Sequence, residues 1–249
     1  MWNNETVSVV FPAYNEEANI EAAVRDFLGV KNADGSPLID EIVVINNNSS
    51  DRTEELARAA GARVVTETKQ GYGNALQRGL AEADKNITVL CEPDGTFTAS
   101  DIVKLLAYSG DLDMVLGTRT HASLLREGAN MGLFLRWGNI WVAKMMQILY
   151  AMPALTDCGC TFRLIRTDQA KKILGDLTVG KSHFLPNMLI VAHLHGLKFA
   201  EVPLRYGQRI GMSKITGSLS GTWKTGMSMI GIILALWPRF VFSKKRSLP

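Results

Sequence analysis

The chain has 249 residues, of which 47% are hydrophobic and 20% charged, so it can bury a substantial core, and we expect one α/β domain with a C-terminal appendage. Its formal net charge of +3 does not favour wholesale nucleic-acid binding, whereas the run Lys244-Lys245-Arg246 favours contact with anionic lipid or phosphate. Three cysteines, two of them in Cys158-Gly159-Cys160, provide neither a disulfide framework nor zinc-ligand spacing, so a reduced, cytosolic setting is the simpler interpretation.

Strands and helices alternate through the first half of the chain. Short β-rich or apolar runs predict strands at residues 6–11, 41–45, 62–65, 87–92 and 114–119. Helices are predicted at 16–30, 51–61, 71–83 and after residue 100, with caps from Asn15, from Asp51 with Glu54, and from Ser100. This order indicates a mostly parallel sheet with helices on both faces, an architecture of the nucleotide-binding type. The first strand follows the N-terminus almost directly, so we expect no signal peptide.

The fourth predicted strand ends at two acidic side chains, Glu92 and Asp94, and a glycine turn follows at once. Carboxylates at the carboxyl end of a strand in an open α/β sheet face the crevice where such sheets bind ligands. One intervening residue lets a short turn bring both acids near a single hard cation. The triplet therefore indicates a D-x-D-like site for a metal and a diphosphate, although an ordinary turn with Asp94 as a helix cap explains it equally well.

Two loops contain glycines that permit a close approach of the backbone to another group. Gly71-Tyr72-Gly73-Asn74 opens a helix, but a lone G-x-G fits many turns, and an ordinary turn is favoured over a phosphate loop. Residues 205–214 carry cations and two glycines, which suits a loop that folds over a phosphate.

The second half of the chain continues with strands predicted at 161–166 and 199–204 and with short helices capped by Thr167 and Ser182. The second of these helices carries His183, His193 and His195. We interpret these histidines as packing or surface residues, because no metal-like arrangement accompanies them.

Two apolar segments suit a membrane interface. Residues 131–152 form a predicted helix with cations and amides on one face and, on the other, Leu133, Phe134, Trp137, Ile140, Trp141, Met145, Ile148 and Leu149. A helix that merely covers the sheet explains the spacing of these apolar residues equally well. Residues 223–242 are apolar but uninterrupted only from 227 to 237, so an interfacial or re-entrant helix is favoured over a transmembrane one.

Seven short motifs follow one another along almost the whole chain, at residues 11–17, 47–51, 71–76, 92–94, 117–119, 159–163 and 209–214. In this order they resemble the motifs of the family 2 glycosyltransferases of the GT-A fold. Within that family they look most like the dolichyl-phosphate mannose synthase and polyprenyl-phosphate glycosyltransferase branch. We therefore expect a GT-A domain over residues 1–215, which includes the helix at 131–152, and a hydrophobic membrane-associating segment with a basic tail over residues 216–249.

The resemblance implies roles for individual residues. Those that would hold the donor nucleotide are Pro12, Tyr14, Glu16, Ile45, Asn47 and Pro93. Those that would hold Mg²⁺ or Mn²⁺ are Glu92, Asp94 and Thr96. Arg119 and Arg136 would hold the acceptor phosphate, and Arg209 and Lys214 lie in a loop that would close over the diphosphate and join the two acids in catalysis.

The chain departs from the family pattern at three places. Asn46-Asn47 stand where the family has paired aspartates, and an amide carries no charge, so the nucleotide base stays open. Glu92 replaces the first aspartate of D-x-D and keeps its charge. Thr96 is a poorer metal ligand than an acid or an amide, so substrate oxygens and water would hold more of the metal.

Together these patterns predict the metal-dependent, inverting transfer of a sugar from a nucleoside diphosphate sugar to a polyprenyl phosphate at the cytoplasmic face of a membrane. A phosphate acceptor needs no general base, so none is assigned. The alternative is a family member that acts on a saccharide hydroxyl, with Asp157 as its base. A non-catalytic module that binds a nucleotide sugar is the third. The sugar, the base, the prenyl chain and the oligomeric state stay open.

Overall fold

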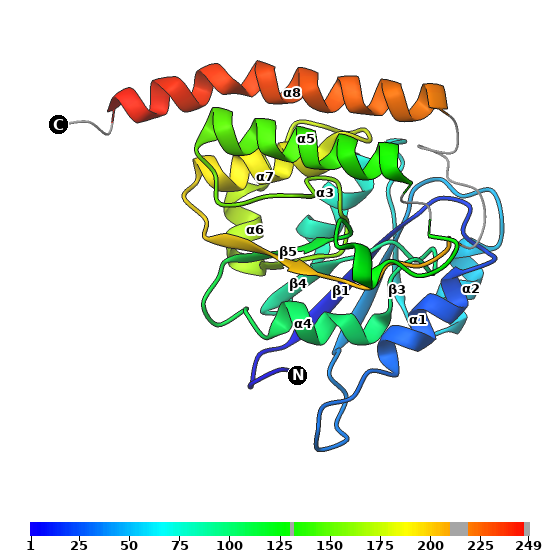
Figure 1. Cartoon of the computed structure of the whole chain (residues 1–249). Helices are drawn as coiled ribbons and strands as arrows, with labels where there is room; N and C mark the ends of the chain where they lie inside the picture. The colour runs from blue at the N-terminus through cyan, green and yellow to red at the C-terminus, as the bar shows by residue number, and fades with distance from the viewer. Residues whose placement is uncertain (130–131, 210–218, 247–249) are drawn as a thin grey trace.

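The computed structural model describes residues 1–129, 132–209 and 219–246, and a seven-stranded sheet forms its centre (Figure 1). The strands are β1 (Val7–Ala13), β2 (Glu41–Asn46), β3 (Arg63–Thr66), β4 (Ile87–Leu90), β5 (Met114–Thr118), β6 (Arg163–Arg166) and β7 (Phe199–Pro203). They lie in the order β3-β2-β1-β4-β6-β5-β7, and β6 runs antiparallel to both of its neighbours while the other pairs are parallel. The predicted mostly parallel sheet is confirmed.

Helices cover both faces of the sheet. One face carries α1 (Ile20–Leu28), α2 (Thr53–Ala59) and α4 (Ile102–Leu106), and the other carries α3 (Tyr72–Glu82), α6 (Thr167–Ile173) and α7 (Phe184–Leu194). Two long helices, α5 (Leu133–Tyr150) and α8 (Leu219–Arg246), lie outside the second layer (Figure 1). Each face therefore has its own hydrophobic core.

The central strands are buried on both sides, and alternate residues supply the two cores. Val10, Val43 and Ile45 point to the core beneath α3, whereas Val9 and Val44 point to the core beneath α1 and α2. This is the two-residue period of a pleated strand whose faces are both covered.

The predicted helix caps at Asn15 and Ser100 are wrong. The first helix begins at Ile20 rather than Glu16, and Asn15 has a positive φ of 52° while its Oδ1 accepts a hydrogen bond from the backbone N–H of Ser50. The Ser100 hydroxyl accepts a hydrogen bond from Arg205, and it lies inside a short 3₁₀ turn. Both side chains join distant segments instead of starting a helix.

The predicted capping box is only partly present. Asp51 accepts hydrogen bonds from the backbone N–H and hydroxyl of Thr53 at the start of α2. Glu54 does not complete the capping box, because its carboxylate accepts hydrogen bonds from Asn46 and Arg58 instead. The helix is thus tied to the end of β2.

Helix α3 packs closely on β1 through Gly79. A Cβ atom at this position would lie 2.2 Å from Cγ1 of Val10, a residue that is fully buried. We expect Gly79→Ala to lower the free energy of unfolding by about 1–3 kcal/mol, because the added methyl group overpacks the core.

The matched control for this substitution is Gly138→Ala, at an exposed site on α5 where an added Cβ meets no atom within 4 Å. It should raise the free energy of unfolding by up to about 1 kcal/mol, because alanine favours the helix. Urea denaturation measures both values. Equal effects of the two substitutions would contradict the close packing of α3 on β1.

Candidate active site

A cleft opens where the carboxyl ends of β1, β2 and β4 meet. Its volume is about 680 Å³ when the open solvent at its mouth is included, and it is lined by Pro12, Ala13, Tyr14, Glu16, Asn47, Gln70, Tyr72, Ala75, Glu92, Pro93 and Arg209. Successive strands are added on opposite sides of the pair β1 and β4, and open α/β sheets bind ligands at such a switch point. The cleft thus brings together Glu92, Arg209 and the predicted nucleotide-binding residues except Ile45.

One arginine bridges three carboxylates at this cleft. Nη1 of Arg209 lies 3.0 Å from Oδ2 of Asp94 and 3.9 Å from Oε2 of Glu92, and its Nη2 lies 3.5 Å from Oε1 of Glu16. The three acids come from two strand ends, and the arginine comes from the segment after β7. The Arg209 guanidinium therefore sits between Glu92 and Asp94.

Asp94 is fixed by its own turn. Its side chain is 1% exposed, and Oδ1 accepts hydrogen bonds from the backbone N–H of Thr96 at 3.0 Å and from the Thr96 hydroxyl at 2.6 Å. Oδ2 receives no hydrogen bond from any residue in the described part of the chain, although Arg209 lies close to it. A buried carboxylate oxygen without a donor is suited to a cation.

Glu92 is held by a pair of hydroxyl groups. Its Oε1 accepts a hydrogen bond of 3.2 Å from Thr161, whose hydroxyl also bonds to that of Tyr72. Burial raises the pKa of Glu92 to about 7, and the charge of Asp94 adds to this rise while Arg209 opposes it. An additional cation at the site would favour the ionised form of Glu92.

These residues suit a divalent metal ion that also binds oxygen atoms of the substrate. Among residues 1–129, 132–209 and 219–246, no three His, Cys, Asp or Glu side chains form a metal-binding group. Asp94 and Glu92 would thus supply two oxygen ligands, and diphosphate oxygens and water would fill the other positions. Thr96 donates to Asp94 and orients it, so a direct bond from Thr96 to the metal stays a prediction.

Two asparagines fasten the end of β2 to the segments around it. Nδ2 of Asn47 donates to the carbonyl oxygens of Glu67 at 2.8 Å and Lys69 at 3.0 Å, and its Oδ1 accepts from the backbone N–H of Gly71 at 2.7 Å. Nδ2 of Asn46 donates to Glu54 at 2.8 Å. An aspartate has no amide N–H, so it could make none of these donor contacts.

The glycines of the Gly71-Tyr72-Gly73 loop approach protein backbone rather than an open site. A Cβ on Gly71 would lie 2.3 Å from the Gly180 carbonyl oxygen, and one on Gly73 would lie 2.2 Å from that of Val179. Asn74 also donates its backbone N–H to Gly180. The ordinary-turn interpretation explains these glycines, and Tyr72 between them reaches the cleft.

Next to the cleft, Arg119 and Asp157 form a closed ion pair. Nε and Nη2 of Arg119 donate to the two Asp157 oxygens at 2.8 and 2.9 Å, and the Asp157 side chain is fully buried. The backbone N–H groups of Arg119 and Gly159 donate to the same carboxylate. Since four donors saturate it, Asp157 is poorly placed to remove a proton.

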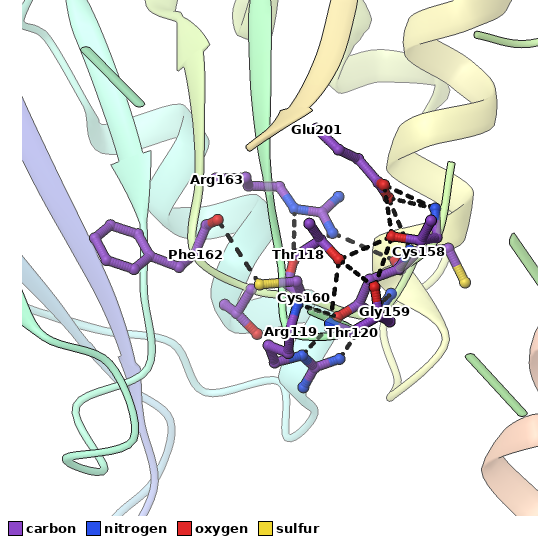
Figure 2. A network of polar contacts seen from close by, with 12 residues as sticks. Thr118, Arg119, Thr120, Cys158, Gly159, Cys160, Phe162, Arg163 and Glu201 are labelled. Atoms are coloured by element: carbon purple, nitrogen blue, oxygen red, sulfur yellow. Dashed lines mark hydrogen bonds and ion pairs between the residues drawn. The ribbon is translucent and has the colours of Figure 1, made fainter. Parts of the chain in front are cut away.

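A second arginine supports the same segment from within the core (Figure 2). Arg163 is 1% exposed and forms no ion pair with a described carboxylate. It donates to the carbonyl oxygens of Cys158, Cys160 and Leu185, and burial lowers its pKa. Arg163 therefore fixes the path of the chain from Cys158 to Cys160.

Three other predicted site residues, Ile45, Arg119 and Arg136, are not part of the cleft lining. Ile45 is fully buried and faces α3. Arg136 is in the first turn of α5, and its buried Nε lacks an acceptor among the described residues. Lys214 lies outside the described residues. The roles predicted for these side chains and for Arg119 stay predictions.

The sequence analysis missed the contribution of Tyr72, Thr161 and Arg163. Tyr72 and Thr161 belong to motifs noted for their glycines and cysteines, but nothing local indicates that their hydroxyl groups meet at Glu92. A lone arginine at the start of a strand likewise gives no sign that it is buried.

Known proteins resemble this chain over most of its length. The profile described as Glycosyl transferase family 2 matches residues 8–174. An uncharacterized protein of Methanocaldococcus jannaschii is 31% identical over 86% of this chain and 89% of the relative. A dolichyl-phosphate hexose transferase of Haloferax volcanii is 29% identical over 92% of this chain and 95% of the relative. The crystal structure of glucosyl-3-phosphoglycerate synthase from Mycobacterium tuberculosis with Mn²⁺, UDP and glucosyl-3-phosphoglycerate covers 93% of this chain and 80% of that one, with 22% identity and a TM-score of 0.67.

The hydrogen bonds of Asn47 predict that an aspartate is not tolerated there. Asn47→Asp would place a buried carboxylate against two carbonyl oxygens, and we expect the free energy of unfolding to fall by about 2 kcal/mol or more. Asn48→Asp is the control, because Asn48 is exposed and donates to one carbonyl. Chemical denaturation at pH 7 compares the two. Equal losses would mean that Asn47 is not locked by its neighbours.

Proposed function

The chain belongs to glycosyl transferase family 2 and has the GT-A fold, and on that premise we propose that this glycosyltransferase moves a hexosyl group from a nucleoside diphosphate sugar to a polyprenyl phosphate. The observation that carries the proposal is the arrangement of carboxylates. Glu92 and Asp94 share one cation at the cleft, whereas Asp157 is already neutralised by Arg119.

On the donor side of the reaction, positive charge would stabilise the leaving diphosphate. A divalent ion, Mg²⁺ or Mn²⁺, held by Asp94 and Glu92 supplies positive charge to the leaving diphosphate when it is bound. Arg209 supplies more from the protein, and the lining of Pro12, Tyr14 and Asn47 suits a nucleoside. The M. tuberculosis synthase was crystallised with Mn²⁺ and UDP, which supports this class of donor and metal.

The acceptor side favours a group that is already ionised. A hydroxyl acceptor needs a base, and the candidate base Asp157 is saturated by hydrogen bonds from Arg119 and Gly159. A phosphate monoester carries nearly two negative charges near neutral pH, so it can attack without a base. A saccharide-hydroxyl acceptor is accordingly the weaker alternative.

A lipid is the form of phosphate that we favour. The H. volcanii relative is named a dolichyl-phosphate hexose transferase, and it matches this chain nearly end to end. The described chain also includes one helical stretch, Gly221–Phe242, that is long and apolar enough to cross a membrane. Transfer at the cytoplasmic face of a membrane would suit a donor made in the cytosol.

The proposal predicts lipid-dependent transfer that requires Asp94. Purified protein with Mn²⁺, a polyprenyl phosphate and a panel of UDP- and GDP-sugars should yield a glycosylated lipid. The product is measured by the transfer of radiolabel from the donor to the lipid. Asp94→Asn should lower turnover by about a hundredfold or more, because the metal loses a charged ligand. Removal of the metal with EDTA should do the same.

The control for this assay is Asp84→Asn, which alters an exposed aspartate paired with Lys85 and should keep full activity. Transfer to soluble saccharides without lipid would overturn the choice of acceptor. Calorimetric binding of the donor without turnover on any acceptor would favour a non-catalytic module instead.

The position of Arg209 predicts competition with the metal. Since its guanidinium lies 3.0 Å from Asp94, an incoming ion must displace it, and Arg209 is then free to contact the diphosphate. Arg209→Gln should raise the affinity for Mn²⁺ without donor by about tenfold, as measured by titration calorimetry, while turnover falls.

Arg205→Gln is the control for this titration, since Arg205 is four positions earlier and pairs with Asp101 at 2.6 Å. Its Mn²⁺ affinity should equal that of the wild type. An unchanged affinity in Arg209→Gln would show that the arginine and the metal do not share a position.

A further inference from the structure

We propose that α5 and α8 together form a surface that lies flat on a lipid bilayer, with α8 along the membrane plane rather than across it. This inference deepens the proposed transfer to a lipid acceptor. It concerns how the protein meets the membrane, and it can be tested without any substrate.

Exposed apolar side chains gather on these two helices. Four of the five tryptophans belong to them, and the set that we call the tryptophan face consists of Trp137, Trp141 and Ile148 on α5 and Trp223, Met227, Leu234 and Trp237 on α8. Their exposed fractions run from 41% for Trp237 to 78% for Ile148. Exposed apolar patches of this kind mark interaction sites, and tryptophan is favoured at membrane interfaces.

The spacing places each set on one stripe. On α5 the intervals from Trp137 are four and eleven residues, and on α8 the intervals from Trp223 are four, eleven and fourteen. These intervals return to the same side of a helix. Both helices start at the same end of the molecule and run side by side (Figure 1). The two stripes are thus parallel.

Helix α8 is fastened lengthwise to the domain. Ile233 is fully buried, and its carbonyl oxygen accepts a hydrogen bond from the Tyr150 hydroxyl of α5. Nε1 of Trp237 donates to the carbonyl oxygen of Leu149 at 3.0 Å. The Phe240 ring packs on Tyr150, with centroids 5.4 Å apart, and on His193 of α7. The second half of α8 is therefore part of the folded domain.

These contacts argue against a membrane-crossing α8. If Gly221–Phe242 crossed the bilayer, Ile233 would lie near its centre, and the ends of α5 and α7 would have to enter with it. Those ends carry polar groups, among them His195, whose Nε2 lies 2.9 Å from Oδ2 of Asp176. Burying such groups in hydrocarbon is costly, whereas an interfacial helix leaves them in water.

A polar stripe completes the pattern on α8. Lys224, Ser228 and Arg239 have spacings that place them between about a quarter and nearly half a turn from the tryptophan face, and both cations are exposed. An interfacial helix requires this combination of a buried apolar side and cations that can reach anionic headgroups. The surface therefore suits an anionic bilayer as its partner.

The segments that precede α5 and Arg209 are in contact with each other. The backbone N–H of Arg126 donates to the carbonyl oxygen of Tyr206, three residues before Arg209, at 2.9 Å.

Binding to vesicles tests the surface. Wild-type protein without donor or polyprenyl phosphate should float with vesicles of phosphatidylglycerol and phosphatidylcholine. The double variant Trp137→Ser, Trp223→Ser should bind them at least about tenfold more weakly. Tyr108→Ser is the control, because Tyr108 is a 49% exposed aromatic residue outside these helices, and it should bind as the wild type does.

Two results would overturn the proposal. One is vesicle binding by the double variant equal to that of the wild type, when thermal unfolding curves show that both proteins are folded. The other is a wild-type protein that is a dimer by light scattering and a double variant that is a monomer, while neither protein binds vesicles. The tryptophan face would then join two copies of the chain. Loss of sugar transfer alone would bear only on the proposed function.

Labelling of introduced cysteines tests the direction of α8. Lys224→Cys and Arg239→Cys are about 22 Å apart along the helix, and the native cysteines are buried. With protein bound to sealed vesicles, a membrane-impermeant maleimide added outside should modify both variants. Protection of one of them, reversed by detergent, would show that α8 crosses the bilayer.

Discussion

Two acidic side chains at the end of one strand repel each other, and the protein keeps them together by supplying a cation. Asp94 is almost completely buried and Glu92 lies beside it, so without Arg209 their charges would meet in a medium that screens poorly. Arg209 also reaches Glu16 at the end of β1. The cleft, the two strand ends and the segment after β7 are thus joined by one guanidinium group.

The neighbouring polar groups are arranged so that they do not interfere with this charge. Arg119 and Asp157 neutralise each other, and the buried Arg163 uses backbone carbonyl oxygens in place of a carboxylate. A buried charge without a counterion is costly unless hydrogen bonds surround it. The result is a set of polar groups beside the acidic pair whose charges are already paired or surrounded by hydrogen bonds.

Local signals were enough to predict most of the fold. An apolar run that stops at Glu92 and Asp94 indicates both the strand and the site, because the apolar residues and the charged residues are adjacent in the sequence. The pairing of Arg119 with Asp157 was not predictable in this way, since 38 positions separate them. The same is true of Asn15, whose partner Ser50 is 35 positions away and whose cap was therefore misplaced. Side chains that join distant segments look like ordinary caps or turns in the sequence.

The antiparallel strand β6 sets the order in which the site can be completed during synthesis. It lies between β4 and β5, although it follows both along the chain. On the ribosome, β4 must therefore remain an open sheet edge until Arg163 has emerged, while β1, β2 and β3 already have their partners. Thr161, which bonds to Glu92, arrives with that late strand. The part of the cleft built on β1 and β2 can thus assemble first. Its acidic pair acquires Thr161 only after nearly two thirds of the protein has been translated, and Arg209 only after more than four fifths.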